Sequence, residues 1–411
     1  MNNFLGKIWY FLFSNIMWLY LVMGICSIFG FHLMIFQLMM FVNTLFLMYN
    51  FNKIKFSNLL DIFVVLYIVW IVINSICIDY PHHWHLWYNS IMTNMLPLLF
   101  YFTAKTVNVE IEDILKKFTV PIVISMIFGL VFYYTEPSWY TAIKMAQVNS
   151  VAANGEISDE LMIEIFRFSS FWATPYVIGY AAMYYADYNL EKIFSDNTHK
   201  KHIKKNFFLF LLSAVAILLT QFRASIYALI VTIIYLALLA KNKIKISYIL
   251  IIVVFGIFTI AYLFNENTDI GMSFRERMVK GVDSEHLEER FEYTGRDADL
   301  TTLEGLGYGR FGPRANEYGM FSVQDSEYQK VQAELGHIGF ALFVGIIATS
   351  LLISFRKKHL QLEFIIILFF AIAFVGSSCI SASTTFPFIF WYVLGRISIK
   401  KNNSHKKITA K

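Results

Sequence analysis

The chain alternates between long apolar runs and short polar segments, and the runs are long enough to cross a bilayer as helices. A transmembrane helix needs about 20 predominantly apolar residues. Runs of this kind lie at residues 8–29, 31–49, 59–77, 87–104, 118–134, 169–187, 206–220, 223–240, 247–264, 337–354, 364–381 and 385–399. The pattern predicts an all-α integral membrane protein with about 12 transmembrane helices.

Composition supports this class and excludes others. Hydrophobic residues make up 57% of the 411 residues and charged residues 15%, below the roughly 25% typical of soluble domains. The basic residues are scattered lysine pairs, which argues against a nucleic-acid partner. All three cysteines fall in or beside apolar runs, which argues against disulfide, metal or redox chemistry. The first run lacks a small-residue cleavage site before Gly30, which favours a retained first span over a cleaved signal peptide.

Lysines and arginines fall on opposite sides of the predicted spans. If both termini are cytoplasmic, 21 of the 24 lysines lie in short cytoplasmic loops, whereas eight of the 10 arginines lie outside. Lysine-rich short loops mark the cytoplasmic face. We therefore expect cytoplasmic termini, and the arginines on the far side require another explanation.

Two external loops are long and polar, at residues 135–168 and 265–336. The expected organisation is helices 1–9 in residues 1–264, a large periplasmic loop at 265–336, helices 10–12 in 337–399 and a basic cytoplasmic tail at 400–411. The large loop carries 15 of the 29 acidic residues. Such long loops are usually functional or disordered.

Local signals predict order inside the large loop. Apolar spacing at residues 273–293 fits a helix lying along the membrane surface. Gly305, Gly307, Gly309 and Gly312 predict tight turns, either a close-packed structure or backbone that aims N–H groups at an anion. Ser326 followed by Gln329 is a capping box that predicts a helix through Leu335.

Arginine chemistry is the leading functional signal. Arg167 and Arg223 stand at membrane edges and Arg296 lies in the large loop. Snorkelling to lipid headgroups is one reading of either edge arginine. Together, the three arginines favour recognition of a diphosphate, because the guanidinium group keeps its charge and offers forked donors. Its charge would also stabilise a diphosphate that departs from a sugar.

Other polar residues have two readings each. Asp325 precedes the capping residue, and it either compensates the helix dipole or orients an acceptor hydroxyl. His337 begins the tenth run and is favoured as a headgroup-level residue. The histidines of His82-His83-Trp84-His85 have no standard zinc spacing, so an interfacial aromatic belt is favoured over a metal site. Tyr308, Phe311 and Tyr318 are candidates for stacking on sugar rings.

Four segments resemble the O-antigen polymerase and O-antigen ligase superfamily of bacterial inner-membrane proteins. They are Arg167-Phe-Ser-Ser-Phe-Trp-Ala-Thr-Pro175, Gln221-Phe-Arg223-Ala-Ser225, Thr294-Gly295-Arg296, and Gly305 through Gly312 continuing past Asp325-Ser-Glu-Tyr328 to Glu334-Leu-Gly336-His-Ile-Gly339-Phe340. Their order, spacing and shared external side carry the resemblance. The ligase branch usually has a histidine where this chain has Asp325, which favours the polymerase branch.

The resemblance implies a GT-C-like architecture and a metal-independent inverting glycosyltransferase without a cofactor. It would polymerise undecaprenyl-diphosphate-linked oligosaccharide at the periplasmic face of the inner membrane, with membrane lipid and a chain-length regulator protein as candidate partners. The expected catalytic residues are Arg223, Arg296 and Asp325. The expected substrate-binding residues are Arg167, Arg310, Arg314, Tyr328, Glu334 and His337. No metal ligand is expected.

Two rival functions remain. An O-antigen ligase would use the same diphosphate chemistry and transfer the finished glycan to a lipid A-core acceptor. A transporter or lipid flippase would bury charges at mid-membrane and show repeated halves. The span interiors contain almost no ionisable residue and the polar mass is a single external loop, so the sequence favours the polymerase.

Overall fold

The computed structural model describes residues 4–28, 35–77, 84–107, 109–151, 167–171, 175–194, 200–239, 243–265, 302–312, 315, 323, 326–377 and 386–399. Within these ranges every regular element is a helix, and no strand occurs. The predicted all-α class is confirmed.

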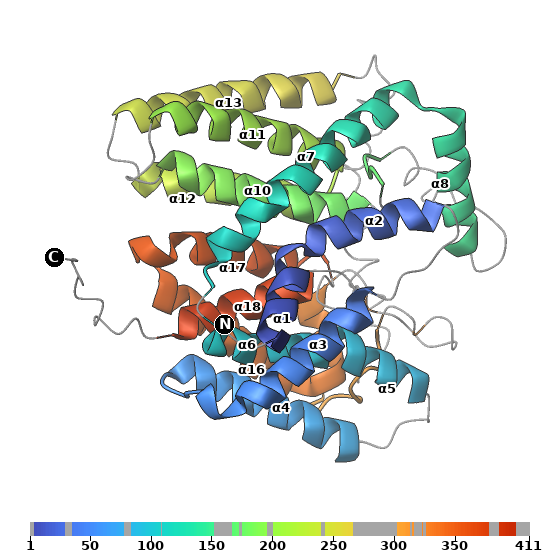
Figure 1. The fold of residues 1–411 in the computed structure, drawn as a ribbon, viewed down its shortest axis with the longest axis vertical. Coiled ribbons are helices and arrows are strands. Elements are labelled where there is room, and N and C mark those ends of the chain that lie inside the picture. The colour runs from blue at the N-terminus through green and yellow to red at the C-terminus, as the bar shows by residue number, and fades with distance from the viewer. Residues whose placement is uncertain are drawn as a thin grey trace.

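The helices follow the apolar runs closely, with a few additions (Figure 1). They are α1 (Phe4–Ser14), α2 (Ile16–Ile28), α3 (Ile35–Asn50), η1 (Phe51–Lys53), α4 (Leu59–Cys77), α5 (Trp84–Ser90), η2 (Ile91–Met95), α6 (Leu96–Thr106), α7 (Ile111–Thr135), α8 (Ser138–Val151), α10 (Pro175–Phe194), α11 (Lys200–Leu219), α12 (Arg223–Leu239), α13 (Lys243–Leu263), α16 (Glu327–Ser354), η5 (Lys358–Leu360), α17 (Gln361–Ala373) and α18 (Phe386–Ser398). The first apolar run is broken at Asn15, where α1 and α2 meet at 60°.

Four helices of the described chain are long and apolar enough to cross a membrane. They are Leu59–Ile76, Ile111–Thr135, His202–Leu219 and Glu327–Ser354, and the bent pair α1–α2 makes a fifth if it counts as one span. Large apolar side chains cover the outer surface, among them Phe258 at 72% and Leu238 at 83% exposed. An apolar exterior of this kind is typical of contact with lipid.

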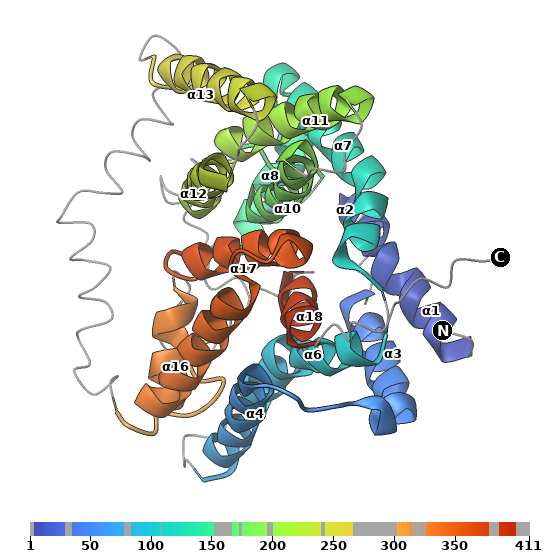
Figure 2. The same cartoon turned by 90° about the vertical axis from the view of Figure 1, so that its left-hand side faces the viewer.

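The helices form two groups that meet at α17. In Figure 1, α2, α7, α8 and α10 to α13 form the upper group, and α1, α3 to α6 and α16 to α18 form the lower group. Within them, α10 packs against α7, α11 and α12, α6 packs against α18, and α4 packs against α16. Helix α17 joins the groups because it packs against both α10 and α12, as Figure 2 shows from one end of the bundle.

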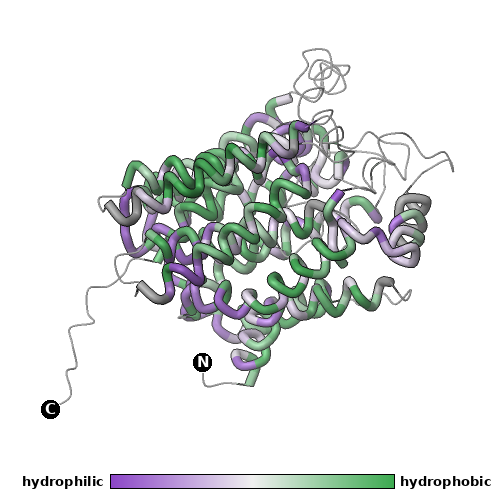
Figure 3. Tube along the Cα trace, turned by 90° about the horizontal axis from the view of Figure 1, so that it is seen from above, coloured by the Kyte–Doolittle hydropathy of each residue, from purple (hydrophilic) through white to green (hydrophobic). Residues whose placement is uncertain are grey.

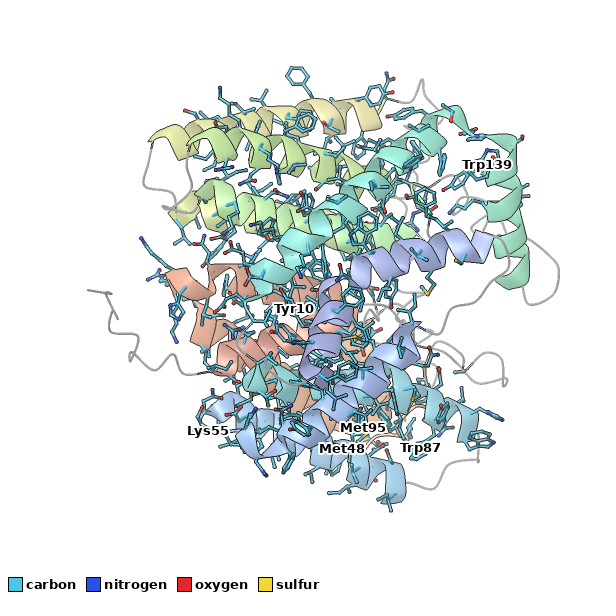
Figure 4. The ribbon with its side chains drawn as sticks, in the orientation of Figure 1. Tyr10, Met48, Lys55, Trp87, Met95 and Trp139 are labelled. Atoms are coloured by element: carbon cyan, nitrogen blue, oxygen red, sulfur yellow. The ribbon has the colours of Figure 1, made fainter. Side chains whose placement is uncertain are left out.

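The two ends of the bundle differ in chemistry. Hydrophobic positions dominate the lengths of the helices and hydrophilic positions gather towards their ends (Figure 3). Trp87 on α5 and Trp139 on α8 lie towards one end, and Lys55 lies towards the other (Figure 4). We call the end with Arg167 and Arg223 the arginine end, and the end with Lys192, Lys205 and Lys358 the lysine end.

Helix boundaries differ from the expected ones at two places near the candidate site. Helix α10, which corresponds to the apolar run at 169–187, begins at Pro175 and not at residue 169, because proline suits the first helical position. Arg167 therefore lies in an irregular segment before the helix and does not open it, which corrects the expected boundary. The loop at 135–168 contains an unexpected helix, α8. The expected surface helix at 273–293 lies outside the described residues.

The helix that follows the large loop begins as its sequence predicts. Ser326 is its N-cap, and the Ser326 side chain accepts a hydrogen bond from the Gln329 backbone N–H. The helix then breaks at Gly336, whose φ is 68°, and continues to Ser354 as a candidate span. The Ser326 N-cap and a helix that runs through Leu335 are confirmed.

Candidate functional site

Arg167 is held against the turn that carries Arg223. The Arg167 side chain is buried, with 2% exposed, and its Nε donates a hydrogen bond to the carbonyl oxygen of Thr220 at 2.8 Å. In that turn Gln221 has a φ of 53°, and α12 starts at Arg223. Two arginines that lie 56 positions apart in the sequence therefore belong to one local structure.

A second buried cation joins this structure from α8. Lys144 is 4% exposed, and its Nζ contacts the Ser169 hydroxyl, two residues from Arg167. Tyr140, one turn earlier on α8, donates to the carbonyl oxygen of Ser170 at 2.8 Å. Lys144, Tyr140 and Arg167 line a small cavity of about 40 Å³. Lys144 had no signal in the sequence beyond its place in an external loop, because the helix that carries it was not predicted.

The turn at residues 220–223, which we call the arginine turn, also contacts the chain just beyond α17. The ring of Tyr180 on α10 packs against Phe222, the residue before Arg223, with centroids 5.0 Å apart. The Tyr180 hydroxyl donates to Ser377 Oγ at 3.0 Å, just beyond α17. Arg223 itself is partly buried at the first position of α12.

The start of α16 is anchored at the same end of α17. The Ser326 hydroxyl and the Glu327 backbone N–H both donate to the carbonyl oxygen of Phe374, each at 3.0 Å. The arginine turn and the Ser326 cap are thus both linked to residues 374–377. Asp325, the residue before the cap, lies outside the described residues, as do Arg296 and Arg314.

The glycine segment of residues 305–312 forms tight turns, as expected. Gly305, Gly307 and Gly309 all have positive φ values. A Cβ atom at Gly305 would lie 2.4 Å from the Glu334 carbonyl oxygen, so only glycine fits there. The Gly307 N–H donates to the same carbonyl oxygen at 3.2 Å. The segment is a close-packed turn fixed to the first part of α16.

Glu334 supports this segment from inside the protein. It is 2% exposed, its Oε1 accepts the Phe311 backbone N–H at 3.0 Å, and its Oε2 lies 3.7 Å from Lys330 Nζ. These contacts hold the backbone on one side of Arg310, which is itself partly buried. Glu334, expected to bind substrate, is thus buried and bonded to the backbone of the segment.

Two expected sugar contacts are buried instead. Tyr308 is 3% exposed and Phe311 is 5% exposed. The Tyr308 hydroxyl donates to the Ser90 carbonyl oxygen at 3.1 Å, and burial raises its pKa well above the usual value. Neither ring is accessible for stacking, because both pack into the protein to anchor the turn. Tyr318 lies outside the described residues.

The remaining expected contacts are spread around α16. Tyr328 is partly buried, and its hydroxyl donates to the Ala371 carbonyl oxygen of α17 at 3.1 Å. His337 is exposed, 3.4 Å from the Gln332 side chain, which fits its reading as a headgroup-level residue. In the described ranges no set of His, Cys, Asp and Glu could hold a metal ion, although His82 and His83 fall outside them.

Buried acids inside the helices are the main feature that the sequence reading missed. Asp61 on α4 is 1% exposed and pairs with Lys105, and it also accepts the Ser57 N–H at 2.6 Å as part of the helix start. Asp187 on α10 is fully buried near the Thr232 hydroxyl of α12. No hydrogen bond of ordinary geometry reaches its carboxylate from a described residue. Asp187 is the last residue of the apolar run at 169–187 and one of the few ionisable residues in the runs, and its burial could not be predicted from the sequence.

Comparison with known proteins leaves the geometry as the main guide to function. No protein-family model matches the sequence, and no functionally characterised protein matches it either.

Proposed function

We propose that the protein is a polysaccharide polymerase that transfers a glycan from an undecaprenyl-diphosphate carrier to the next carrier-linked repeat unit. The single observation that carries the proposal is the buried cation cluster of Arg167, Lys144 and the Arg223 turn. Cations gathered in one place raise the local concentration of an anionic ligand. A diphosphate at the lipid boundary is the anion that fits forked guanidinium donors.

The proposal includes a topology. All of the apolar runs would cross the bacterial inner membrane in a GT-C-like arrangement, with the lysine end in the cytoplasm and the arginine end in the periplasm. Lysine-rich segments at one end and exposed Trp87 and Trp139 at the other support this orientation. The carrier's polyprenyl tail would remain in lipid while its diphosphate reaches the arginine turn.

In the proposed reaction an acceptor sugar hydroxyl attacks the anomeric carbon of the donor glycan. The new glycosidic C–O bond forms as the bond between that carbon and the carrier diphosphate breaks, and the configuration inverts. Arg167 and Arg223 stabilise the charge that grows on the departing diphosphate. The hydroxyl proton passes to a carboxylate, for which Asp325 is the candidate. Holding both lipids at one site supplies much of the rate.

The direct test is an assay of purified protein with a lipid-diphosphate-linked repeat unit and no added metal. We expect Arg223→Lys to insert normally and to lower polymerisation about 100-fold, because lysine keeps the charge but loses the fork. Arg356→Lys, at an exposed arginine beyond the other end of α16, is the matched control and should keep full activity. Long glycans made at the normal rate by the Arg223 variant would contradict the proposal.

A ligase that transfers the glycan to lipid A-core is the nearest alternative, since it needs the same diphosphate site. The two functions separate by the glycan phenotype of a deletion strain. Loss of a polymerase leaves single repeat units on the core, whereas loss of a ligase leaves none.

Transport is a second candidate because Asp187 is buried within the helices. Ionisable residues inside a bundle are typical of proton or ion coupling. If the protein moves a lipid-linked glycan, Asp187→Asn should stop the movement of a labelled carrier lipid across proteoliposomes. The polymerase proposal expects purified Asp187→Asn protein to extend glycans normally and wild-type proteoliposomes to show no such movement.

A further inference from the structure

A large polar crevice opens at the lysine end, away from the arginine cluster. Its volume is about 870 Å³, within the range of small-ligand sites. The start of α7, the end of α10, the start of α11 and the η5–α17 junction line it. In Figure 2, which looks onto this end, α10 and α17 lie next to each other. The crevice therefore lies between the two helix groups.

The inner wall of the crevice presents hydrogen-bond acceptors. Glu363, at the first turn of α17, is 4% exposed. Asn189 on α10 is fully buried, and its Oδ1 finds no hydrogen-bond donor among the described residues. Tyr188 adds an aromatic ring close to these groups. Buried acceptors call for a donor, and a carboxylate with an aromatic ring suits an ammonium group.

The cations nearest this wall are already engaged with other acids. Lys192 Nζ lies 2.7 Å from a carboxylate oxygen of Glu112 and 3.5 Å from one of Glu191. Arg396 pairs with Glu110. Among the described residues, no lysine or arginine forms a salt bridge with the Glu363 carboxylate. An incoming ammonium group could therefore take that position.

The rim of the crevice has the opposite charge. Lys116, Lys205 and Lys358 are exposed around it, together with His202 and His359. Lysine contacts a phosphate as a point charge. A ligand that spans the crevice would therefore meet acceptors inside and cations outside.

We propose that this crevice binds a small zwitterion of the aminoalkyl phosphate class, with its ammonium against Glu363 and Asn189 and its phosphate at the lysine rim. Phosphoethanolamine has this chemistry, either as a lipid headgroup or as a soluble diester. Because its walls come from both helix groups, a bound zwitterion would hold the groups together at α17. The inference stands apart from the proposed polymerase activity, because it concerns binding at the opposite end.

The test measures binding to the full-length protein in phosphatidylglycerol nanodiscs by calorimetry. Three probes separate the charges: glycerophosphoethanolamine has both, ethanolamine has only the amine, and glycerophosphoglycerol has only the phosphate. We expect the zwitterion to bind at least about tenfold more tightly than either other probe. If phosphatidylethanolamine added to the nanodiscs competes with the soluble zwitterion, the source is the lipid headgroup, and if it does not, the source is the soluble diester.

Variants locate the site. Glu363→Gln and Asn189→Leu should each weaken zwitterion binding about tenfold, and Lys205→Gln should weaken glycerophosphoglycerol more than ethanolamine. Lys55→Gln, at an exposed lysine of the same end outside the crevice, is the control and should change nothing. Size-exclusion chromatography shows whether either inner-wall variant misfolds. If one does, the other still tests the site. Equal affinity for all three probes, or equal losses in the Lys55 control, would overturn the proposal.

Discussion

The candidate site at the arginine end and the crevice at the lysine end differ in the charged groups that they bury. At the arginine end Arg167 and Lys144 are buried and bonded to a backbone carbonyl and a hydroxyl. Around the crevice at the lysine end, Lys116, Lys205 and Lys358 are exposed, and Glu363 is buried. This difference underlies the two proposals, in which the arginine end binds an anion and the inner wall of the crevice binds a cation. The count of basic residues at each end thus says less about binding than which charge is buried.

The largest expected effect comes from removing a buried cation. Arg167→Gln loses both the charge and the Nε donor that bonds the Thr220 carbonyl oxygen, so polymerisation should fall about 100-fold or more. The measurement is the rate of glycan extension by purified protein. Lys205→Gln, at the other end, should keep the wild-type rate, and equal losses in the two variants would remove the distinction between the ends.

The geometry of the arginine end also depends on the glycine segment. Gly305→Ala places a Cβ atom 2.4 Å from the Glu334 carbonyl oxygen at a φ of 87°, so we expect a loss of stability of about 1–3 kcal/mol. Thermal unfolding in detergent should show a lower Tm. The control is Gly256→Ala in α13, where a Cβ atom has open space and the helix should gain slightly. Equal Tm values for the two variants would show that the turn is not closely packed.

Glu334 is a buried acid at the arginine end, where it accepts the backbone N–H of Phe311, next to Arg310. We expect Glu334→Gln to reduce polymerisation about tenfold by loosening the Phe311 N–H contact beside Arg310. If Glu334 acts by positioning Arg310, Glu334→Gln should lower the polymerisation rate little further in a protein that already carries Arg310→Gln. Additive losses in the double variant would mean that Glu334 acts independently of that arginine.

The smallest expected effect is a pH dependence at the lysine end. Burial, together with Glu110 and Glu191, raises the pKa of Glu363 to about 7, although Arg396 opposes the shift. Glu363 therefore gains its charge as pH rises through about 7. Ethanolamine has no phosphate to meet His202 and His359 on the rim, and it should bind a few-fold more tightly above this pH. Glu363→Gln should abolish that change, and an unchanged pH profile in the variant would assign the effect to another group.

Sequence patterns predicted the local structures better than their assembly. The Ser326 cap follows from a side chain that accepts a backbone N–H, and the glycine turns follow from a residue that tolerates positive φ. Most helices follow from long apolar runs. The charge distribution predicted that Arg167 and Arg223 lie at the same end of the bundle. That the two belong to one turn did not, because it depends on a hydrogen bond to the Thr220 carbonyl oxygen.

The features that the sequence did not reveal depend on which way a side chain faces. Lys144 and Asp187 occupy unremarkable positions in the sequence, and only the packing of α8, α10 and α12 buries them. The crevice depends on four chain segments that are far apart in sequence. Periodicity shows that a helix has a polar residue, but neighbouring helices decide whether that residue meets solvent, lipid or another buried group.

The central claim is that buried cations at the arginine end hold a lipid diphosphate. It is tested most directly by the binding of a short-chain prenyl diphosphate to purified wild-type, Arg167→Gln, Arg223→Lys and Lys205→Gln proteins under identical salt. We predict that the two arginine variants bind at least about tenfold more weakly while Lys205→Gln binds as the wild type does. Equal affinity of all four proteins, or a loss confined to Lys205→Gln, would contradict the account.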